Sequence, residues 1–100
     1  MEPVVVAKVS EIQPGEARVV VVAGRPLALF NVNGTFYATD NTCLHRGGPL
    51  GEGFLDGDVV TCPHHGWQYD VTSGQSFMNP AAKLRTYHVV VEGEDVKVLP

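Results

Sequence analysis

The stretch LFNVNGTFYA, residues 29–38, decides how this sequence folds. Asn33 and Gly34 stand between two segments of strand-forming residues, and the central positions of a type I′ turn need the positive φ that Asn and Gly tolerate best. The stretch therefore predicts a β-hairpin. Its second strand runs directly into residues 40–43, so we expect the side chains of that segment to be held at the end of a rigid sheet.

Runs of Val and of other aliphatic or aromatic residues, bounded by Gly or Pro, predict further strands on both sides of the hairpin. No stretch of about ten residues shows a helical apolar period, so the sequence predicts an all-β protein with at most a helical turn or two. Residues 46–57 are rich in glycine and are expected to form a connecting loop, where the glycines serve either ordinary turns or a close approach of the backbone to a bound group. The strands are expected at residues 4–7, 17–23, 27–32, 58–61, 67–71, 84–92 and 95–99.

The composition describes one ordinary globular domain, residues 1–100, with 44% hydrophobic and 18% charged residues. The net charge is −4 and the basic residues are scattered singly, which argues against nucleic acid as a partner and favours a protein partner with a basic patch. The N-terminal residues lack the basic flank and apolar run of a signal peptide, and no apolar stretch approaches the ~18 residues of a membrane span. We therefore expect a soluble, cytoplasmic protein that does not contact a membrane.

Both cysteines and three of the four histidines fall in two short segments, Cys43-Leu44-His45 and Cys62-Pro63-His64-His65. In the cytoplasm such cysteines are metal ligands or catalytic groups more often than members of a disulfide. Two thiolates and two imidazoles fit either a tetrahedral zinc ion or a 2Fe-2S cluster in which one iron takes the cysteines and the other the histidines. The order Cys-His, then Cys-His, favours the cluster, because structural zinc sites usually pair the two cysteines and then the two histidines.

With 16 residues between His45 and Cys62, the two segments resemble the ligand pattern of the Rieske iron–sulfur proteins, C-x-H followed by C-x-x-H. The likeness continues through the flank CPHHGWQYD, residues 62–70, and through Ser73-Gly74. In strand pattern it covers nearly the whole chain. The resemblance implies the Rieske fold of stacked antiparallel sheets, with a cluster-binding subdomain formed by two loops at about residues 40–82 and a base formed by the remainder.

The same resemblance implies one 2Fe-2S cluster per chain. Cys43 and Cys62 would hold the buried iron, and His45 and His65 the outer iron. The C-x-x-H count assigns His65 rather than its neighbour His64 as the second imidazole ligand.

The chain departs from the respiratory and photosynthetic branch of this family at three positions. That branch has a disulfide between its cluster loops where this chain has Gly48 and His64, and a serine that donates a hydrogen bond to a bridging sulfide where this chain has Trp67. Tyr69 matches the tyrosine of that branch. Fewer hydrogen bonds to cluster sulfur leave an added electron less stabilised, so we expect a reduction potential in the low part of the Rieske range of about −150 to +300 mV.

The flank at residues 67–70 is similar to that of aromatic-ring-hydroxylating systems, in both their oxygenases and their small ferredoxins. An oxygenase subunit needs a second domain with a mononuclear iron site, which 100 residues cannot contain. The resemblance therefore implies a stand-alone ferredoxin, a one-electron carrier and not an enzyme, that passes electrons from an NAD(P)H-dependent flavoprotein reductase to a terminal oxygenase. The alternative is a small Rieske subunit of a larger oxidoreductase, of nitrite-reductase type. The outlying alternative is a zinc-stabilised interaction module.

Overall fold

The computed structural model describes residues 2–44, 48–64 and 66–99. Within these residues the chain forms nine strands and two single-turn 3-10 helices, and no helix there is long and apolar enough to cross a membrane. In chain order the elements are β1 (Val4–Lys8), η1 (Val9–Glu11), β2 (Ala17–Val22), β3 (Arg25–Val32), β4 (Thr35–Asp40), η2 (Leu50–Glu52), β5 (Phe54–Asp56), β6 (Val59–Thr61), β7 (Gln68–Asp70), β8 (Thr86–Glu92) and β9 (Asp95–Leu99).

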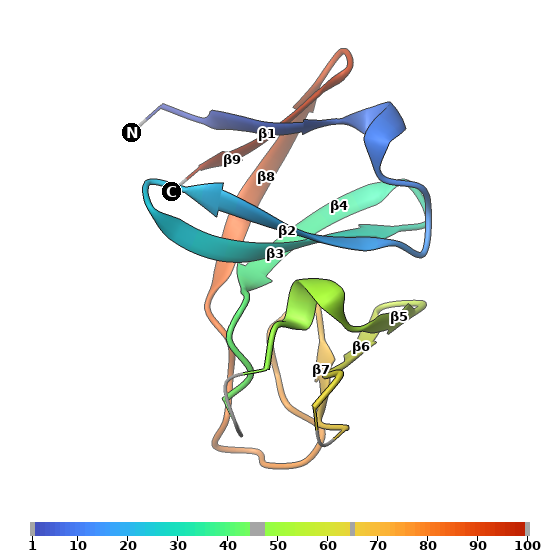
Figure 1. Ribbon diagram of the computed structural model, residues 1–100, viewed down its shortest axis with the longest axis vertical. Coiled ribbons are helices and arrows are strands. Elements are labelled where there is room, and N and C mark those ends of the chain that lie inside the picture. Colours follow the sequence, from blue (N-terminus) through green and yellow to red (C-terminus); the bar gives the residue numbers. More distant parts are fainter. Residues whose placement is uncertain (1, 45–47, 65, 100) are drawn as a thin grey trace.

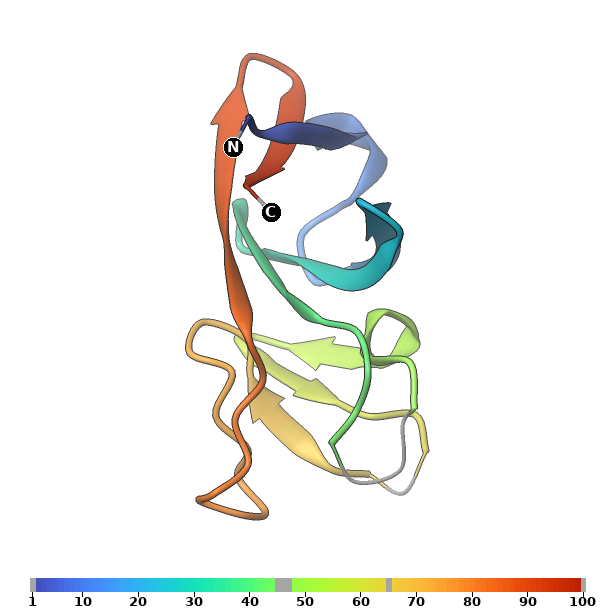
Figure 2. The same cartoon turned by 90° about the vertical axis from the view of Figure 1, so that its left-hand side faces the viewer.

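The strands form two antiparallel sheets. A six-stranded sheet has the order β1-β9-β8-β4-β3-β2, and a three-stranded sheet has the order β5-β6-β7. The two sheets follow one another along the longest axis of the molecule, as Figures 1 and 2 show from two sides. The prediction of an all-β fold of antiparallel sheets is confirmed.

The hairpin at residues 29–38 forms as predicted. Val32 pairs with Thr35, and the two turn residues adopt positive φ angles, 52° at Asn33 and 95° at Gly34. The buried side chain of Asn31 strengthens the turn, because its Oδ1 accepts a hydrogen bond from the Gly34 N–H at 2.7 Å. Its Nδ2 donates to the carbonyl oxygen of Ile12, also at 2.7 Å, so the same side chain ties the hairpin to the segment before β2.

Strand β3 is buried on both faces and joins two hydrophobic cores. Leu27 and Leu29 face the first core, whereas Ala28 and Phe30 face the second. The alternation of side chains along a strand places these two pairs on opposite faces. The first core also contains Ala7, Ile12, Val20, Val22, Phe36, Ala38, Val96 and Val98. The second core also contains Cys43, Leu50, Val60, Cys62, Tyr69, Val71 and Leu84.

The prediction of a connecting loop at residues 46–57, of which 46 and 47 lie outside the described residues, is wrong for residues 50–56, which contain η2 and β5. Leu50 is fully buried there and anchors η2 in the second core. Gly57 takes a φ of +62° in the two-residue turn that lets Asp56 pair with Val59, so β5 and β6 form a hairpin. The glycines of this stretch therefore serve a hairpin turn and close packing as well as a connection.

The three-stranded sheet and its loops are inserted between two neighbouring strands of the larger sheet, β4 and β8. Ala38 pairs with Tyr87, and the Asp40 N–H donates to the carbonyl oxygen of Arg85 at 3.0 Å. The Tyr87 hydroxyl donates a hydrogen bond to Asp40 Oδ1 at 2.6 Å. Two effects raise the pKa of Tyr87: its burial, which is the larger, and this contact with the Asp40 carboxylate. The chain thus leaves the large sheet and returns to it at the same point.

Candidate metal centre

The two cysteines begin two loops that are closed in the same way. The Cys43 N–H donates to the carbonyl oxygen of Gly48 at 2.9 Å, and the Cys62 N–H donates to the carbonyl oxygen of Trp67 at 2.7 Å. Each hydrogen bond spans five residues, so each loop is pinned at its base by the residue expected to bind iron. Asn41 supports the first loop through two further hydrogen bonds. Its Oδ1 accepts one from the Gly51 N–H at 2.8 Å, and its carbonyl oxygen accepts one from the Leu50 N–H at 2.7 Å.

The cysteine side chains meet in a dry environment inside the second core. Cys43 and Cys62 are each 2% exposed. Burial raises the pKa of the Cys62 thiol, the backbone N–H of His64 opposes this rise by hydrogen bonding to the sulfur, and the neighbouring Cys43 side chain adds to it. The structure therefore brings together two sulfurs from two separate loops, as the sequence predicted for one pair of ligands.

The side chain of Tyr69 reaches the first loop from strand β7. Tyr69 is fully buried. Its hydroxyl oxygen accepts a hydrogen bond from the Leu44 N–H at 3.0 Å and lies 3.4 Å from Cys43 Sγ. Because the hydroxyl oxygen is already an acceptor, its own hydrogen remains for donation to the sulfur. Burial, followed by the contact with Cys43, raises the pKa of Tyr69 far above its ordinary value, so the hydroxyl keeps its proton at neutral pH.

Gly48 marks the closest approach of the two loops. A Cβ atom at this position would lie 2.7 Å from Cys62 Sγ and 3.2 Å from the Cβ of His64. Positions 48 and 64 therefore face one another across the two loops. A side chain at position 48 would clash with Cys62 Sγ, so glycine is required there. At Gly48 the backbone lies close to a cysteine sulfur, and the expected approach of the backbone to a bound group stays a prediction.

The remaining residues singled out from the sequence lie around this pair or away from it. Trp67 is partly buried against the second core, with its ring centroid 6.4 Å from that of Tyr69. His64 and His88 are both exposed. His45 and His65, the two expected imidazole ligands, lie outside the described residues, and within the described residues no group of three or more His, Cys, Asp or Glu side chains surrounds a possible metal position.

The donor set on the cysteine side suits an iron–sulfur cluster. Thiolates are the ligands that such clusters take, and the His64 N–H and the Tyr69 O–H supply hydrogen bonds to sulfur of the kind that stabilise its negative charge. Sequence reasoning noted that Tyr69 matches the family pattern but did not find its bond to the Leu44 N–H. It also missed the shared closure of the two loops, which involves backbone atoms alone.

Comparisons with known proteins agree with this geometry. The model of the Rieske [2Fe-2S] domain family matches residues 2–88. The ferredoxin component of the naphthalene 1,2-dioxygenase system of Pseudomonas aeruginosa is 39% identical over 89 residues, covering 88% of this chain and 86% of that relative. The solved ferredoxin of carbazole 1,9a-dioxygenase from Nocardioides aromaticivorans IC177 superimposes with a TM-score of 0.93 at 28% identity, over 100% of this chain and 99% of that one. A chain in the solved complex of reduced oxygenase and oxidized ferredoxin of carbazole 1,9a-dioxygenase is 40% identical with a TM-score of 0.88, over 96% of this chain and 91% of that one.

The chain belongs to the Rieske [2Fe-2S] family. Membership means one 2Fe-2S cluster per chain, and it identifies the antiparallel sheets described above as the Rieske fold. The relatives named above include ferredoxins of naphthalene and carbazole dioxygenase systems.

Proposed function

We propose that this protein is a Rieske ferredoxin, a one-electron carrier between an NAD(P)H-dependent flavoprotein reductase and a terminal oxygenase. The observation that supports it most strongly is the identity with a dioxygenase-system ferredoxin over 88% of this chain and 86% of the relative. The similarity to a chain of an oxygenase–ferredoxin complex supports the oxygenase as the electron acceptor. We further propose a cytoplasmic location, where NAD(P)H is the reductant.

The proposed cluster ligands are Cys43, His45, Cys62 and His65. The buried, adjacent thiols of the two cysteines support their half of this set. When bound, the cluster accepts and releases one electron. The protein's own residues hold the loops in register, exclude water from the sulfurs and donate hydrogen bonds to them, and none of the described residues is proposed to make or break a substrate bond.

The division of the chain into a cluster-binding part at about residues 40–82 and a base stays a prediction. The insertion of the three-stranded sheet between β4 and β8 supports it. So does the presence of a separate core behind each sheet.

Metal and acid-labile sulfide analysis tests the proposal. Two irons with two sulfides per chain and a Rieske electron paramagnetic resonance signal are expected for a 2Fe-2S cluster with mixed ligands. One zinc without sulfide would instead support the interaction module, and co-purification with a large catalytic chain would support the subunit of a larger oxidoreductase.

A matched pair of variants tests the ligand assignment. His65→Ala is expected to abolish the Rieske signal, because it removes one of the two imidazoles from the outer iron. His64→Ala is expected to keep the signal, because the exposed His64 side chain is not a proposed ligand. Loss of the signal in the His64 variant, with retention in the His65 variant, would reverse the assignment.

A further inference from the structure

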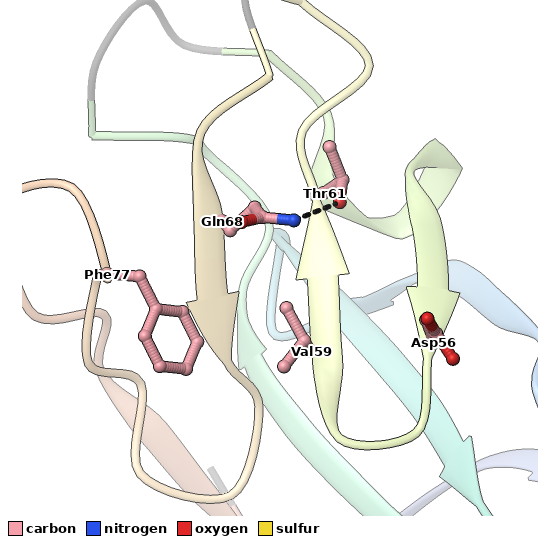
Figure 3. A pocket seen from close by; sticks show the side chains of 5 residues that line it. All are labelled: Asp56, Val59, Thr61, Gln68 and Phe77. Carbon is pink, nitrogen blue, oxygen red and sulfur yellow. Dashed lines mark hydrogen bonds between the residues drawn. The ribbon is translucent and has the colours of Figure 1, made fainter.

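The outer face of the three-stranded sheet carries side chains that the cluster site does not use. Leu55, Val60 and Tyr69 point inward to the second core. Because side chains alternate along a strand, their neighbours on β5, β6 and β7 point outward. Figure 3 shows this outer face, with side chains from β5, β6, β7 and the segment that follows β7.

A hollow of about 360 Å³ lies on this face, lined by Asp56, Val59, Thr61, Gln68 and Phe77. The Phe77 ring stands on one side and the Asp56 carboxylate on the other (Figure 3). Val59 lies between them (Figure 3), and nearer the cysteine loop Gln68 Nε2 donates a hydrogen bond to Thr61 Oγ1 at 3.3 Å. The carboxylate at one edge of the hollow suits a Lys or Arg side chain of a partner, and the exposed ring at the other edge suits an apolar one.

Exposed apolar side chains border the hollow. Phe54 is 73% exposed, and it pairs across the strands with Thr61, which lines the hollow. Phe77 is 57% exposed and is held beside β7 by its N–H, which donates to the Gln68 carbonyl oxygen at 3.0 Å. Single exposed apolar residues need no explanation, but aromatic residues gathered around a polar hollow are typical of a protein contact surface.

The net negative charge of the chain lies in the same part, because basic residues are absent from it. Residues 47–82 contain no Lys or Arg, and they are bounded by Arg46 and Lys83. They contain four of the eleven acidic residues, whereas the rest of the chain holds all seven basic residues and the other seven acidic ones. The net charge of −4 therefore belongs to this segment. The four acidic residues are Glu52, Asp56, Asp58 and Asp70.

We infer that the outer face of β5, β6 and β7 is a docking surface for a redox partner whose contact surface carries Lys or Arg side chains around apolar residues. A cationic side chain of the partner pairs with Asp56 at one edge of the hollow, and apolar residues of the partner cover Phe77 and Phe54. Complementary charge steers such an encounter and speeds association. The inference rests on the proposed function as an electron carrier.

The position of this face suits electron transfer. Strand β6 ends at Thr61, directly before Cys62, and strand β7 begins at Gln68, directly after the residue that closes the same loop. A partner docked on these strands contacts the elements that carry the second cysteine loop.

Ferric cytochrome c is a suitable probe, because it presents lysines around an apolar haem edge. The reduced cluster gives one electron to the ferric haem, which becomes ferrous, and the cluster returns to its oxidised state. The second-order rate constant is measured by stopped flow at about 0.01 M and about 0.15 M salt, where the Debye length falls from about 30 Å to about 8 Å. We expect the wild-type rate constant to fall with salt.

Two face variants and two matched controls locate the contact. Asp56→Asn and Phe77→Ala are each expected to lower the low-salt rate constant about threefold or more, and Asp56→Asn to flatten its salt dependence. Glu94→Gln removes the same charge in the exposed turn between β8 and β9. Val21→Ala truncates an apolar side chain that is 66% exposed on β2. Both controls are expected to leave the rate constant unchanged.

The inference is overturned if the face variants behave like the controls, if Glu94→Gln lowers the rate as much as Asp56→Asn, or if the wild-type rate does not fall with salt. Oxidation by ferricyanide, a small anion that needs no docking surface, is measured in parallel. It should not slow in any variant, and slowing would assign the effect to the cluster rather than to docking. Failure of the proposed function shows itself separately, as absence of the Rieske signal in the wild-type protein.

Discussion

Replacing Tyr69 by Phe removes one oxygen atom next to the proposed cluster and leaves the ring in the core. The hydroxyl lies 3.4 Å from Cys43 Sγ and accepts the Leu44 N–H at 3.0 Å. Reduction adds negative charge to the cluster and its sulfurs, so a donated O–H hydrogen bond stabilises the reduced state more than the oxidised one. We therefore expect Tyr69→Phe to lower the reduction potential.

The size of the shift follows from hydrogen-bond energetics. A hydrogen bond to a charged group contributes about 1.5–3 kcal/mol, and only the part that differs between the two oxidation states changes the potential. A difference of about 1 kcal/mol corresponds to about 40 mV for a one-electron couple. The same substitution leaves the Leu44 N–H without its tyrosine acceptor, which should lower the free energy of unfolding by about 1–3 kcal/mol.

A redox titration followed by electron paramagnetic resonance measures the potential, and guanidinium unfolding measures the stability. Tyr87→Phe is the matched control, because it removes a hydroxyl that bonds to Asp40, on a side chain that packs against the first core. It should lower stability without moving the potential. An unchanged potential in Tyr69→Phe together with reduced stability would refute the reasoning, since the hydroxyl would then only position the loop. The wild-type titration also tests the expectation of a potential in the low part of the Rieske range.

Two further substitutions test the loops and the hairpin. Gly48→Ala would place a Cβ 2.7 Å from Cys62 Sγ, and the shift that this forces should lower the free energy of unfolding by about 1–3 kcal/mol. We expect less iron per chain by metal analysis. Full iron content would contradict the close packing described. Asn31→Ala removes the hydrogen bonds to Gly34 and Ile12 and should lower the free energy of unfolding by about 1–3 kcal/mol. Its Rieske signal should stay unchanged, and an altered signal would mean that the hairpin influences the cluster.

The parts of the fold that sequence reasoning predicted are those with strong local signals. Asn33-Gly34 fixes its hairpin through backbone angles that few other residue pairs adopt. Strand β5 was missed because three residues between glycines carry almost no periodicity, and its pairing depends on the turn at Gly57. In the larger sheet the predicted strands differ from the observed ones by one or two residues at their ends.

The candidate site, like the fold, could be predicted from the sequence only in part. Spacing and residue type are enough to single out Cys43 and Cys62, and the structure brings them together in the second core. The role of Tyr69 depends on a contact with a residue 25 positions away in the sequence, and no local pattern contains such a contact. The loop closures at Gly48 and Trp67 use main-chain atoms, which leave no mark in the identity of the residues.

The insertion of the three-stranded sheet between β4 and β8 has a consequence for how the protein matures. Asp40 and Arg85 meet across these strands, so the six-stranded sheet can close around the first core without help from the residues between them. Only the second core contains the two cysteines. The first core can therefore form before iron is bound, whereas Ala28 and Phe30 on the other face of β3 are covered only when the second core assembles around its two cysteines.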